Sequence, residues 1–352
     1  MQTILVTGGA GFIGSHACLV LLENNFRVVV LDSFINGSLI ALKKVKEIVG
    51  MKNDYAKENL YIFKGDLRDQ EVLNKLFNDC NQRNMPIEAV LHFAGLKAVS
   101  DSLKNPKEYW DVNVNGSLRL FKTMEKYKCT KIVYSSSATV YDHSSMGLMS
   151  EDNAIKPTNP YGETKLEVEK ILKRFAVNKP SIWRSVILRY FNPIGAHPSG
   201  MIGEDPQKKA TNLFPLIIEA ASSNKRILEI YGNDWPTCDG TCIRDFIHVM
   251  DLAEAHLASL IYIQKSNPNY SVLNVGTGKG TTLLELIKIF EKVNNCKIPY
   301  KFVKRRDGDI PQSIADNSMI LKTLDWINKR NLEDMCIDGW SWKQKNPKGY
   351  LN

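Results

Sequence analysis

The stretch Thr3-Ile4-Leu5-Val6-Thr7-Gly8-Gly9-Ala10-Gly11-Phe12-Ile13-Gly14 decides the fold of this chain. Its apolar first part predicts a buried strand, and its closely spaced glycines predict a tight turn that opens a helix at residues 14–24. Such a turn lets the pyrophosphate of a dinucleotide approach the helix N-terminus. The next predicted strand, residues 27–31, is followed by Asp32, whose carboxylate can accept hydrogen bonds from an adenosine ribose. Because that charge would repel a 2′-phosphate, the stretch predicts NAD and not NADP.

Strands and helices continue to alternate outward from this turn. Further strands are predicted at residues 60–63, 89–93, 131–134 and 185–190, and further helices at residues 69–77, 107–127 and 160–177. This alternation predicts an α/β fold with a Rossmann-type doubly wound parallel sheet.

The pattern changes after about residue 192, where proline and glycine become frequent and the predicted segments become shorter and mixed. We therefore expect an NAD-binding Rossmann domain at residues 1–191 and a smaller mixed α/β C-terminal lobe for the substrate at residues 192–352. The boundary is soft, because later helices could pack back on the first sheet. Residues 52–59 are polar and are expected to form a surface loop.

Composition narrows the class of protein. The 352 residues are 43% hydrophobic and 24% charged, which is ordinary for a globular protein. No apolar run approaches the roughly 18 residues of a membrane span, and the N-terminus lacks signal-peptide features, so we expect a soluble cytoplasmic protein. The net charge of +8 is spread along the chain, which favours a solvated surface over a nucleic-acid site.

The cysteines favour free thiols. Seven are present, an odd number, which argues against a disulfide framework. Cys238 and Cys242 are close in sequence, but no second pair stands at the spacing of a zinc site. We expect no metal.

Tyr161 and Lys165 indicate the chemistry. On a helix, residues four apart share a face, so the Lys165 ammonium is expected to lower the phenol pKa of Tyr161 from about 10 and make Tyr161 a general base. Ser137 ends a run of serines after the fifth strand and could bind a substrate oxygen. Taken singly, the glycine turn could lack a ligand and the Tyr-x-x-x-Lys spacing could be an ordinary amphipathic helix. Taken together, they favour alcohol oxidation by a base beside a hydride acceptor.

Ten segments in order carry a family resemblance: LVTGGAGFIGSH (5–16), HFAGLKAV (92–99), NVNGSLRL (113–120), SSSATVY (135–141), PYGETK (160–165), LRYFNPIGAHPSG (188–200), GEDP (203–206), RDFIHVMDLA (244–253), NVGTG (274–278) and RRDGD (305–309). On these the chain resembles the extended short-chain dehydrogenases/reductases and, within them, the UDP-glucose 4-epimerase (UDP-galactose 4-epimerase) family.

The resemblance implies a reaction of galactose metabolism that has no net redox change. Tyr161 would take the proton of the sugar 4-hydroxyl while the C4 hydride passes to tightly bound NAD. The 4-keto sugar would turn about its diphosphate, and hydride and proton would return on the opposite face. UDP-galactose and UDP-glucose would be interconverted.

The resemblance also implies residue roles. Catalysis would rest on Ser137, Tyr161 and Lys165. The residues expected to contact NAD, besides these three, are Gly8, Gly11, Phe12, Ile13, Gly14, Asp32, Ser33, Phe34, Asn36, Gly37, Asp66, Leu67, Phe93, Ala94, Gly95, Lys97, Asn113 and Phe191. Those expected to contact the UDP-sugar are Lys97, Ser137, Tyr161, Asn192, Asn212, Leu213, Tyr231, Arg244, Arg306, Asp309 and Ser313.

Ser313 occupies a position at which family members carry either tyrosine or a smaller residue. A serine would leave room beside the sugar 2-substituent, which leads us to expect that UDP-GlcNAc and UDP-GalNAc are also accepted. The family resemblance further implies a homodimer, with the helices at residues 107–127 and 160–177 as candidates for a shared bundle.

Other interpretations remain. A 4,6-dehydratase of the same superfamily would carry an Asp-Glu pair where this chain has Ala138 and Thr139. A decarboxylase acting on UDP-glucuronate would need a clamp for the sugar carboxylate. A simple NAD-dependent dehydrogenase would release NADH. A non-enzymatic NAD-binding protein would commonly lack Tyr161 or Lys165.

Overall fold

The computed structural model describes residues 1–142, 147–179, 182–206, 210–223, 226–266, 268–306 and 308–350. The chain forms two compact units. Unit 1 comprises Met1–Val140, Pro157–Arg189 and Ala253–Leu273, and unit 2 comprises Tyr141–Lys156, Tyr190–Leu252 and Asn274–Asn352. Unit 1 therefore includes a segment that lies well beyond residue 191.

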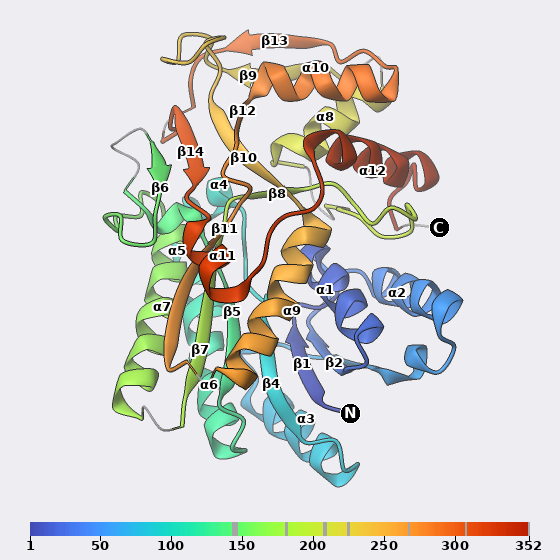
Figure 1. The fold of residues 1–352 in the computed structure, drawn as a ribbon, viewed down its shortest axis with the longest axis vertical. Coiled ribbons are helices and arrows are strands. Elements are labelled where there is room, and N and C mark those ends of the chain that lie inside the picture. The colour runs from blue at the N-terminus through green and yellow to red at the C-terminus, as the bar shows by residue number, and fades with distance from the viewer. Residues whose placement is uncertain are drawn as a thin grey trace. The chain divides into compact units, whose positions relative to one another are not determined.

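Unit 1 is built on a seven-stranded sheet (Figure 1). In spatial order its strands are β3 (Leu60–Lys64), β2 (Arg27–Asp32), β1 (Thr3–Thr7), β4 (Ile87–His92), β5 (Lys131–Ser137), β7 (Arg184–Tyr190) and β11 (Tyr270–Val275). The four pairs from β3 to β5 are parallel. The α/β fold class and the six predicted strands are confirmed, and β11 adds a seventh.

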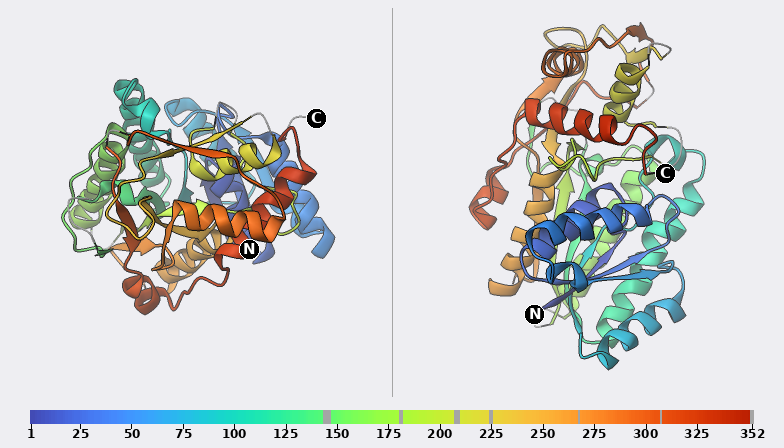
Figure 2. Two further views of the ribbon diagram at one scale, coloured as in Figure 1. Left: turned by 90° about the horizontal axis from the view of Figure 1, so that it is seen from above. Right: turned by 90° about the vertical axis from the view of Figure 1, so that its right-hand side faces the viewer.

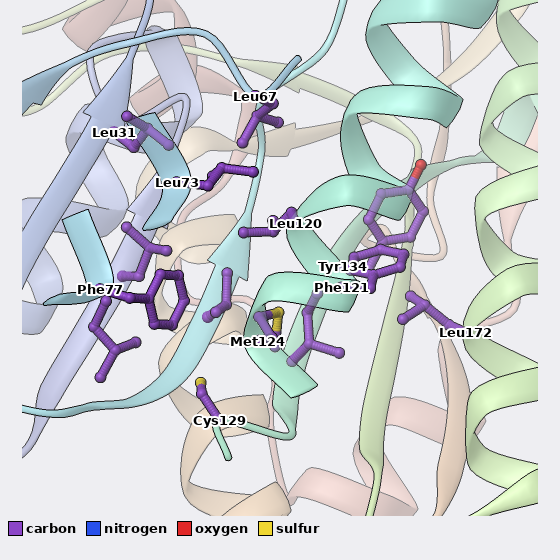
Figure 3. Packing of buried hydrophobic residues seen from close by; sticks show 14 of the residues in the cluster. Leu31, Leu67, Leu73, Phe77, Leu120, Phe121, Met124, Cys129, Tyr134 and Leu172 are labelled. Atoms are coloured by element: carbon purple, nitrogen blue, oxygen red, sulfur yellow. The ribbon is translucent and has the colours of Figure 1, made fainter. Parts of the chain in front are cut away.

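Both faces of this sheet are covered, as the apolar strand sequences require. Helices α1 (Phe12–Glu23) and α2 (Leu39–Lys52) lie on one side, and α3 (Gln70–Gln82), α6 (Gly116–Lys126) and α7 (Pro160–Asn178) on the other (Figures 1 and 2). On the second side Phe77, Leu120, Phe121 and Leu172 pack into one buried cluster (Figure 3). This rigid layer fixes the carboxyl ends of the strands.

Two local predictions differ from the structure. The helix expected at residues 107–127 is three consecutive pieces, α5 (Pro106–Trp110), a π-helical turn η2 (Asp111–Asn115) and α6. The polar segment 52–59 begins at the last residue of α2 and ends in a short 3-10 helix, η1 (Ala56–Asn59). The sequence pattern also missed α2, although Ser38 is its N-cap and accepts a hydrogen bond from the Ile40 amide.

Unit 2 has a smaller sheet with the strand order β12 (Gly280–Thr282), β10 (Ile243–His248), β14 (Gln312–Ala315) and β6 (Leu148–Met149), and β8 (Asn192–Ile194) also pairs with β10. A separate parallel pair joins β9 (Leu228–Tyr231) to β13 (Tyr300–Val303). Helices α8 (Leu213–Ser222), α10 (Leu283–Asn294) and α12 (Leu332–Lys345) supply much of its core. The remaining short elements are α4 (Val99–Ser102), η3 (Ala138–Val140) and α11 (Ser318–Leu324), and the long helix α9 (Val249–Lys265) runs from one unit into the other.

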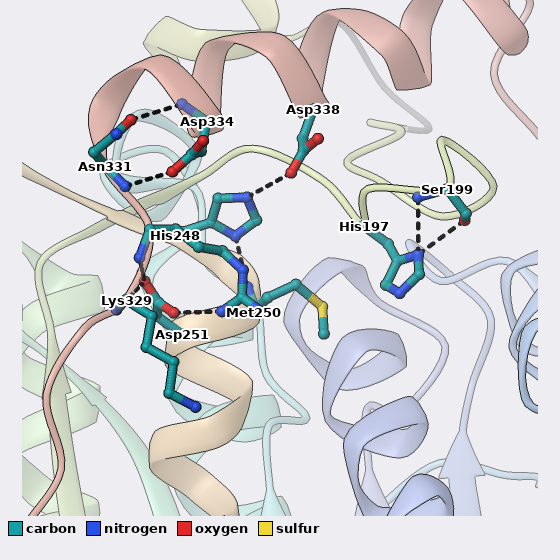
Figure 4. A network of polar contacts seen from close by, with 10 residues as sticks. His197, Ser199, His248, Met250, Asp251, Lys329, Asn331, Asp334 and Asp338 are labelled. Atoms are coloured by element: carbon teal, nitrogen blue, oxygen red, sulfur yellow. Dashed lines mark hydrogen bonds and ion pairs between the residues drawn. The ribbon is translucent and has the colours of Figure 1, made fainter.

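Buried polar contacts tie β10 to α12 inside unit 2 (Figure 4). The His248 ring accepts a hydrogen bond from the Met250 amide at Nδ1, so its proton lies on Nε2, which faces Asp338 at 3.1 Å. The Asp251 carboxylate accepts from the amides of Lys329 and Arg330 just before α12 begins. These contacts hold the end of β10, the strand that carries Arg244. Among the described residues, none of the helices combines the length and apolar character needed to cross a bilayer.

Candidate active site

The glycine turn lies where the strand order of the sheet reverses, between β1 and β4. Gly8 has φ +71°, and a Cβ placed on it would lie 2.7 Å from the amide nitrogen of Ala94. A Cβ on Gly14 would lie 2.2 Å from the Gly8 carbonyl oxygen. The turn is therefore packed as closely as backbone permits. Gly11 is the N-cap of α1, whose uncharged first turn presents backbone N–H groups suited to an anion.

Asp32 stands at the end of β2 beside this turn. Its carboxylate accepts hydrogen bonds from the amides of Ala10, at 2.9 Å, and Phe34, at 2.8 Å. Burial raises the pKa of Asp32, and these two hydrogen bonds oppose that rise. A carboxylate offers about four lone-pair sites, so acceptor capacity remains for ribose hydroxyls. The structure places Asp32 beside the glycine turn, as the sequence predicted.

The loop after β4 is held by Asn113 of the π-helical turn. The Asn113 side chain accepts from the Leu96 amide at 2.7 Å and donates to the Leu96 carbonyl and to Thr164 Oγ1, each at 3.0 Å. Gly95 packs against the same side chain, since a Cβ there would lie 2.9 Å from Asn113 Oδ1. Asn113 thus positions residues 93–97 through its amide group. A π-helical turn at a functional loop is a recurring arrangement.

Asp66, at the start of the loop that follows β3, is engaged by a neighbouring cation. The Arg68 guanidinium donates to both of its carboxylate oxygens, and this lowers the pKa of Asp66. Of the remaining predicted NAD contacts, Phe12 and Ile13 begin α1, and residues 33–37, 67, 93–94 and 97 lie on loops of unit 1. Phe191 belongs to unit 2.

Ser137, Tyr161 and Lys165 come together at the end of β5 and the start of α7. Helix α7 begins at Pro160, after an Asn159 cap that accepts from the Gly162 amide at 2.9 Å. The Ser137 side chain lies close enough to Tyr161 to lower its pKa. The Lys165 ammonium lies 5.8 Å from the centre of the Tyr161 ring. The predicted catalytic grouping is therefore present in the geometry of unit 1.

Thr139 and Gly162 complete this arrangement. Ser137 Oγ accepts from the amide of Thr139 at 3.2 Å and from its hydroxyl at 3.0 Å, which leaves the Ser137 proton free to point at Tyr161. A Cβ on Gly162 would lie 2.7 Å from the Thr139 carbonyl oxygen, so the helix start and the end of β5 are in close contact.

The expected fall in the pKa of Tyr161 is wrong. Burial raises the pKa of Tyr161 to about 12, and the hydrogen bond from Ser137 opposes that rise. Lys165 points its ammonium at the carbonyl of Ser135, 2.6 Å away, and burial lowers the pKa of Lys165 to about 8 against the opposing charge of Glu169. Spacing alone could not give this result, because the dominant cause is burial of Tyr161 by the surrounding unit.

His92, buried beneath this site, is a neutral structural residue. Its Nδ1 lies 2.7 Å from Thr7 Oγ1 and its Nε2 2.8 Å from Ser117 Oγ. Burial, with a smaller contribution from the charge of Lys165, lowers the pKa of His92 to about 3. It links β1, β4 and α6 below the glycine turn.

In unit 2, the residues predicted for UDP form two groups. In the first, Arg244 lies opposite Ser313 in the sheet, donates to the Ile310 carbonyl at 3.0 Å and lies 3.7 Å from the Asp309 carboxylate. In the second, the Arg306 guanidinium stacks 4.2 Å from the centre of the Tyr231 ring. An arginine on an aromatic face keeps its donors free in the plane, as recognition of a diphosphate or uracil requires.

The other predicted contacts sit at the ends of elements in unit 2. Asn212 is the N-cap of α8, directly before Leu213, and its amide donates to Glu204 at 3.3 Å. Asn192 begins β8, next to β10. Of the residues predicted to contact the UDP-sugar, Lys97, Ser137 and Tyr161 lie in unit 1 and the others lie in unit 2.

Comparison with known proteins identifies the family. Residues 4–276 match the model of the NAD dependent epimerase/dehydratase family. The chain belongs to this family.

Similar proteins extend along nearly the whole chain. A UDP-glucose 4-epimerase of Bacillus subtilis is 46% identical over 349 residues, covering 99% of both chains. The crystal structure of UDP-glucose 4-epimerase from Bifidobacterium longum in complex with NAD+ and UDP has a TM-score of 0.91, 42% identity and coverage of 99% of this chain and 100% of that one. The UDP-Glc/GlcNAc 4-epimerase of Campylobacter jejuni gives a TM-score of 0.81 at 32% identity, covering 98% and 100%.

In this member of the epimerase/dehydratase family, the site is also supported by residues to which the sequence analysis assigned no role. Thr139 orients Ser137, Thr164 anchors Asn113, and Glu169 lies in a buried ion pair one turn beyond Lys165. Position i+4 from Lys165 on the same helix was a usable signal for Glu169. Its partner Arg189 lies on β7, and sequence spacing does not reveal that these two residues pair.

Proposed function

We propose that this chain is a UDP-glucose 4-epimerase that interconverts UDP-galactose and UDP-glucose with tightly bound NAD. The observation that carries the proposal is that Ser137, at the end of β5, comes together with Tyr161 and Lys165 at the start of α7. A phenol base held by a hydroxyl and a cation suits proton transfer to and from a sugar hydroxyl. The full-length similarity to UDP-glucose 4-epimerases supports the substrate assignment.

Unit 1 fits NAD. The close contacts at Gly8 and Gly14 leave backbone where a Cβ would fill the space, and α1 offers N–H groups to a pyrophosphate. Asp32, at the end of β2, would accept from the ribose hydroxyls. Residues 33–37, 66–67 and 93–97 would line the rest of the site in unit 1, and Phe191 is proposed as a further NAD contact. When bound, NAD supplies an acceptor for the C4 hydride.

Tyr161 would take the proton of the sugar 4-hydroxyl and later return it. Because burial raises the pKa of Tyr161 to about 12, the phenol must lose its own proton before it can act as this base. The hydrogen bond from Ser137 and the charge of Lys165 favour its phenolate. Lys165 has a pKa of about 8, so it is mostly an ammonium at neutral pH. With substrate bound, Ser137 would donate its single proton to the reacting sugar oxygen in place of Tyr161.

The residues of unit 2 would anchor UDP while the sugar turns. Arg244 and Arg306 supply donors for the diphosphate, Asp309 an acceptor for a ribose hydroxyl, and Tyr231 an aromatic face. Asn192, Asn212 and Leu213 are proposed as further contacts. Lys97 of unit 1 is proposed to contact both NAD and the substrate.

The substrate range is proposed to include UDP-GlcNAc and UDP-GalNAc. Ser313 is small and lies beside Arg244 in the sheet. The Campylobacter jejuni relative is described as a UDP-Glc/GlcNAc 4-epimerase, which supports the extension. A Ser313→Tyr variant should lose turnover of the N-acetyl pair and keep turnover of UDP-galactose. Wild-type protein inactive on the N-acetyl pair would refute the extension.

Assembly and location are proposed as a cytoplasmic homodimer. All seven cysteines are free thiols, as a reducing compartment favours. The helical region of residues 107–127 and helix α7 carry exposed apolar side chains, including Trp110 and Val177. Light scattering during gel filtration should give twice the chain mass of 39.8 kDa, and a mass of one chain would refute the dimer.

The activity is tested by incubating purified protein with UDP-galactose, without added NAD, and separating the products by anion-exchange chromatography. Steady formation of UDP-glucose supports the reaction and retained cofactor. Formation that starts only after NAD is added keeps the reaction and refutes tight retention. Accumulation of NADH would indicate a dehydrogenase, and a 4-keto-6-deoxy sugar a dehydratase. Unchanged UDP-galactose in both conditions would refute the epimerase.

A further inference from the structure

A buried ion pair lies one turn beyond Lys165 on α7. The Glu169 and Arg189 side chains are 3% and 6% exposed. Arg189 Nη2 donates to Glu169 Oε2 at 2.7 Å, and Arg189 Nε donates to Oε1 at 3.1 Å. A bidentate pair of this kind is rigid in both distance and plane.

The same carboxylate reaches the strand that carries Ser137. Ser136 Oγ donates to Glu169 Oε1 at 2.5 Å, and Lys165 donates to the Ser135 carbonyl at 2.6 Å. Two side chains four apart on α7 thus bind two consecutive residues of β5, directly before Ser137. Because Arg189 lies on β7, the next strand of the sheet, Glu169 connects α7 to β5 and β7.

The charges around Lys165 give Glu169 a second effect. The groups facing the Lys165 ammonium are the rings of Tyr134 and Tyr161 and the neutral His92. Burial lowers the pKa of Lys165, and the Glu169 carboxylate acts in the opposite direction. Without that carboxylate, two cations, Lys165 and Arg189, would remain buried in the same region of unit 1, and the lysine would lose its proton more readily.

We propose that Glu169 is a positioning residue that keeps Lys165 in its charged form and fixes the end of β5 so that Ser137 faces Tyr161. The inference rests on the proposed function, because it assigns Lys165 a catalytic role. Glu169 itself does not touch the reacting atoms in this assignment.

The test compares kcat for UDP-galactose from pH 6 to pH 9 in the wild-type holoenzyme, Glu169→Gln and Glu167→Gln. Glu167 is the matched control, because it lies on the same helix and pairs with Arg174 at the surface. In Glu169→Gln we expect the alkaline fall of kcat to begin at lower pH. A shift of one pH unit would make kcat about fivefold lower at pH 8 and nearly unchanged at pH 6.5. General damage would lower kcat equally at every pH. A Glu169→Gln profile that falls where the wild type falls would overturn the proposal.

A second measurement does not depend on activity. A lysine whose folded pKa lies below its unfolded value binds fewer protons when folded, so its contribution to stability rises as pH increases from the folded pKa of about 8 towards the unfolded one. The difference in Tm between Glu169→Gln and wild type, followed from pH 6 to pH 10, should show this rise starting at lower pH in the variant. A flat difference would contradict the proposal. If the wild type does not turn over UDP-galactose, the proposed function fails, and this profile alone decides the role of Glu169.

Should Glu169→Gln fail to fold, Ser136→Ala tests the positioning with a smaller change. It removes the hydrogen bond to Glu169 and leaves every charge in place. We expect a severalfold loss of kcat, an unchanged KM and an unchanged pH for the alkaline fall. Wild-type kcat in Ser136→Ala would overturn the positioning role.

Discussion

Substituting Gly14 by alanine should break the glycine turn, and Gly11→Ala is its matched control. The new Cβ at position 14 would lie 2.2 Å from the Gly8 carbonyl oxygen and 2.8 Å from the Gly9 Cα, and both atoms are backbone. Non-bonded heavy atoms prefer separations of about 3.5 Å or more, so the turn must move by about 1 Å. At Gly11, which has φ −79°, the added Cβ would meet the Gly8 oxygen at an ordinary 3.4 Å.

The expected destabilisation of Gly14→Ala has two parts. Overpacking costs about 1–3 kcal/mol. Displacing the Gly8 oxygen also weakens its hydrogen bond from the Gly11 amide, worth about 1 kcal/mol. Gly14→Ala should therefore lose about 2–4 kcal/mol of unfolding free energy in urea titrations, together with its retained NAD. When NAD is removed from all three proteins before the titration, Gly11→Ala should unfold like the wild type. Gly11→Ala should nevertheless fail to retain NAD, because its methyl group stands where the pyrophosphate approaches. Wild-type stability of Gly14→Ala would refute the reasoning, and so would wild-type NAD content in both variants.

Three further predictions concern the sites themselves. Because the pKa of His92 is about 3 folded and near 6.5 unfolded, the folded chain loses stability below pH 6.5, by about 2 kcal/mol at pH 5; urea midpoints at pH 7 and pH 5 should show a smaller drop in His92→Gln, and an equal drop would contradict the assignment. Tyr161→Phe should keep NAD, measured by absorbance, and lose about 10²–10⁴-fold in kcat; near-normal turnover would rule out Tyr161 as the base. Arg306→Gln should raise the KM for UDP-galactose about tenfold, a loss of about 1.4 kcal/mol of binding, with little change in kcat; an unchanged KM would remove Arg306 from the UDP site.

The strands of the parallel sheet could be predicted because their sequences are continuous apolar runs. Ile4, Leu5 and Val6 are fully buried in β1, and such runs, separated by helix patterns, specify a parallel sheet with both faces covered. The addition of β11 to the sheet could not be predicted, because its pairing partner lies far away in the chain. The π-helical turn at Asn113 was missed for the same reason, since its contacts are with Leu96 and Thr164.

Some features of the candidate site could likewise be predicted from the sequence, and others could not. Local spacing was enough to group Tyr161 with Lys165 and to place Asp32 beside the glycine turn. It was not enough for the pKa of Tyr161, which depends on burial by the whole of unit 1, or for the Ser135 carbonyl as the acceptor of the Lys165 ammonium. Long-range packing sets both.

The central claim, that C4 is inverted by removal and return of the same hydride, is tested most directly with UDP-galactose that carries deuterium at C4 of the sugar. The UDP-glucose formed would be isolated and its C4 position read by NMR and mass spectrometry. We predict that the deuterium is retained at C4 and that none is exchanged for solvent hydrogen, because only the hydroxyl proton passes through Tyr161. Deuterium lost to water during inversion would contradict the account.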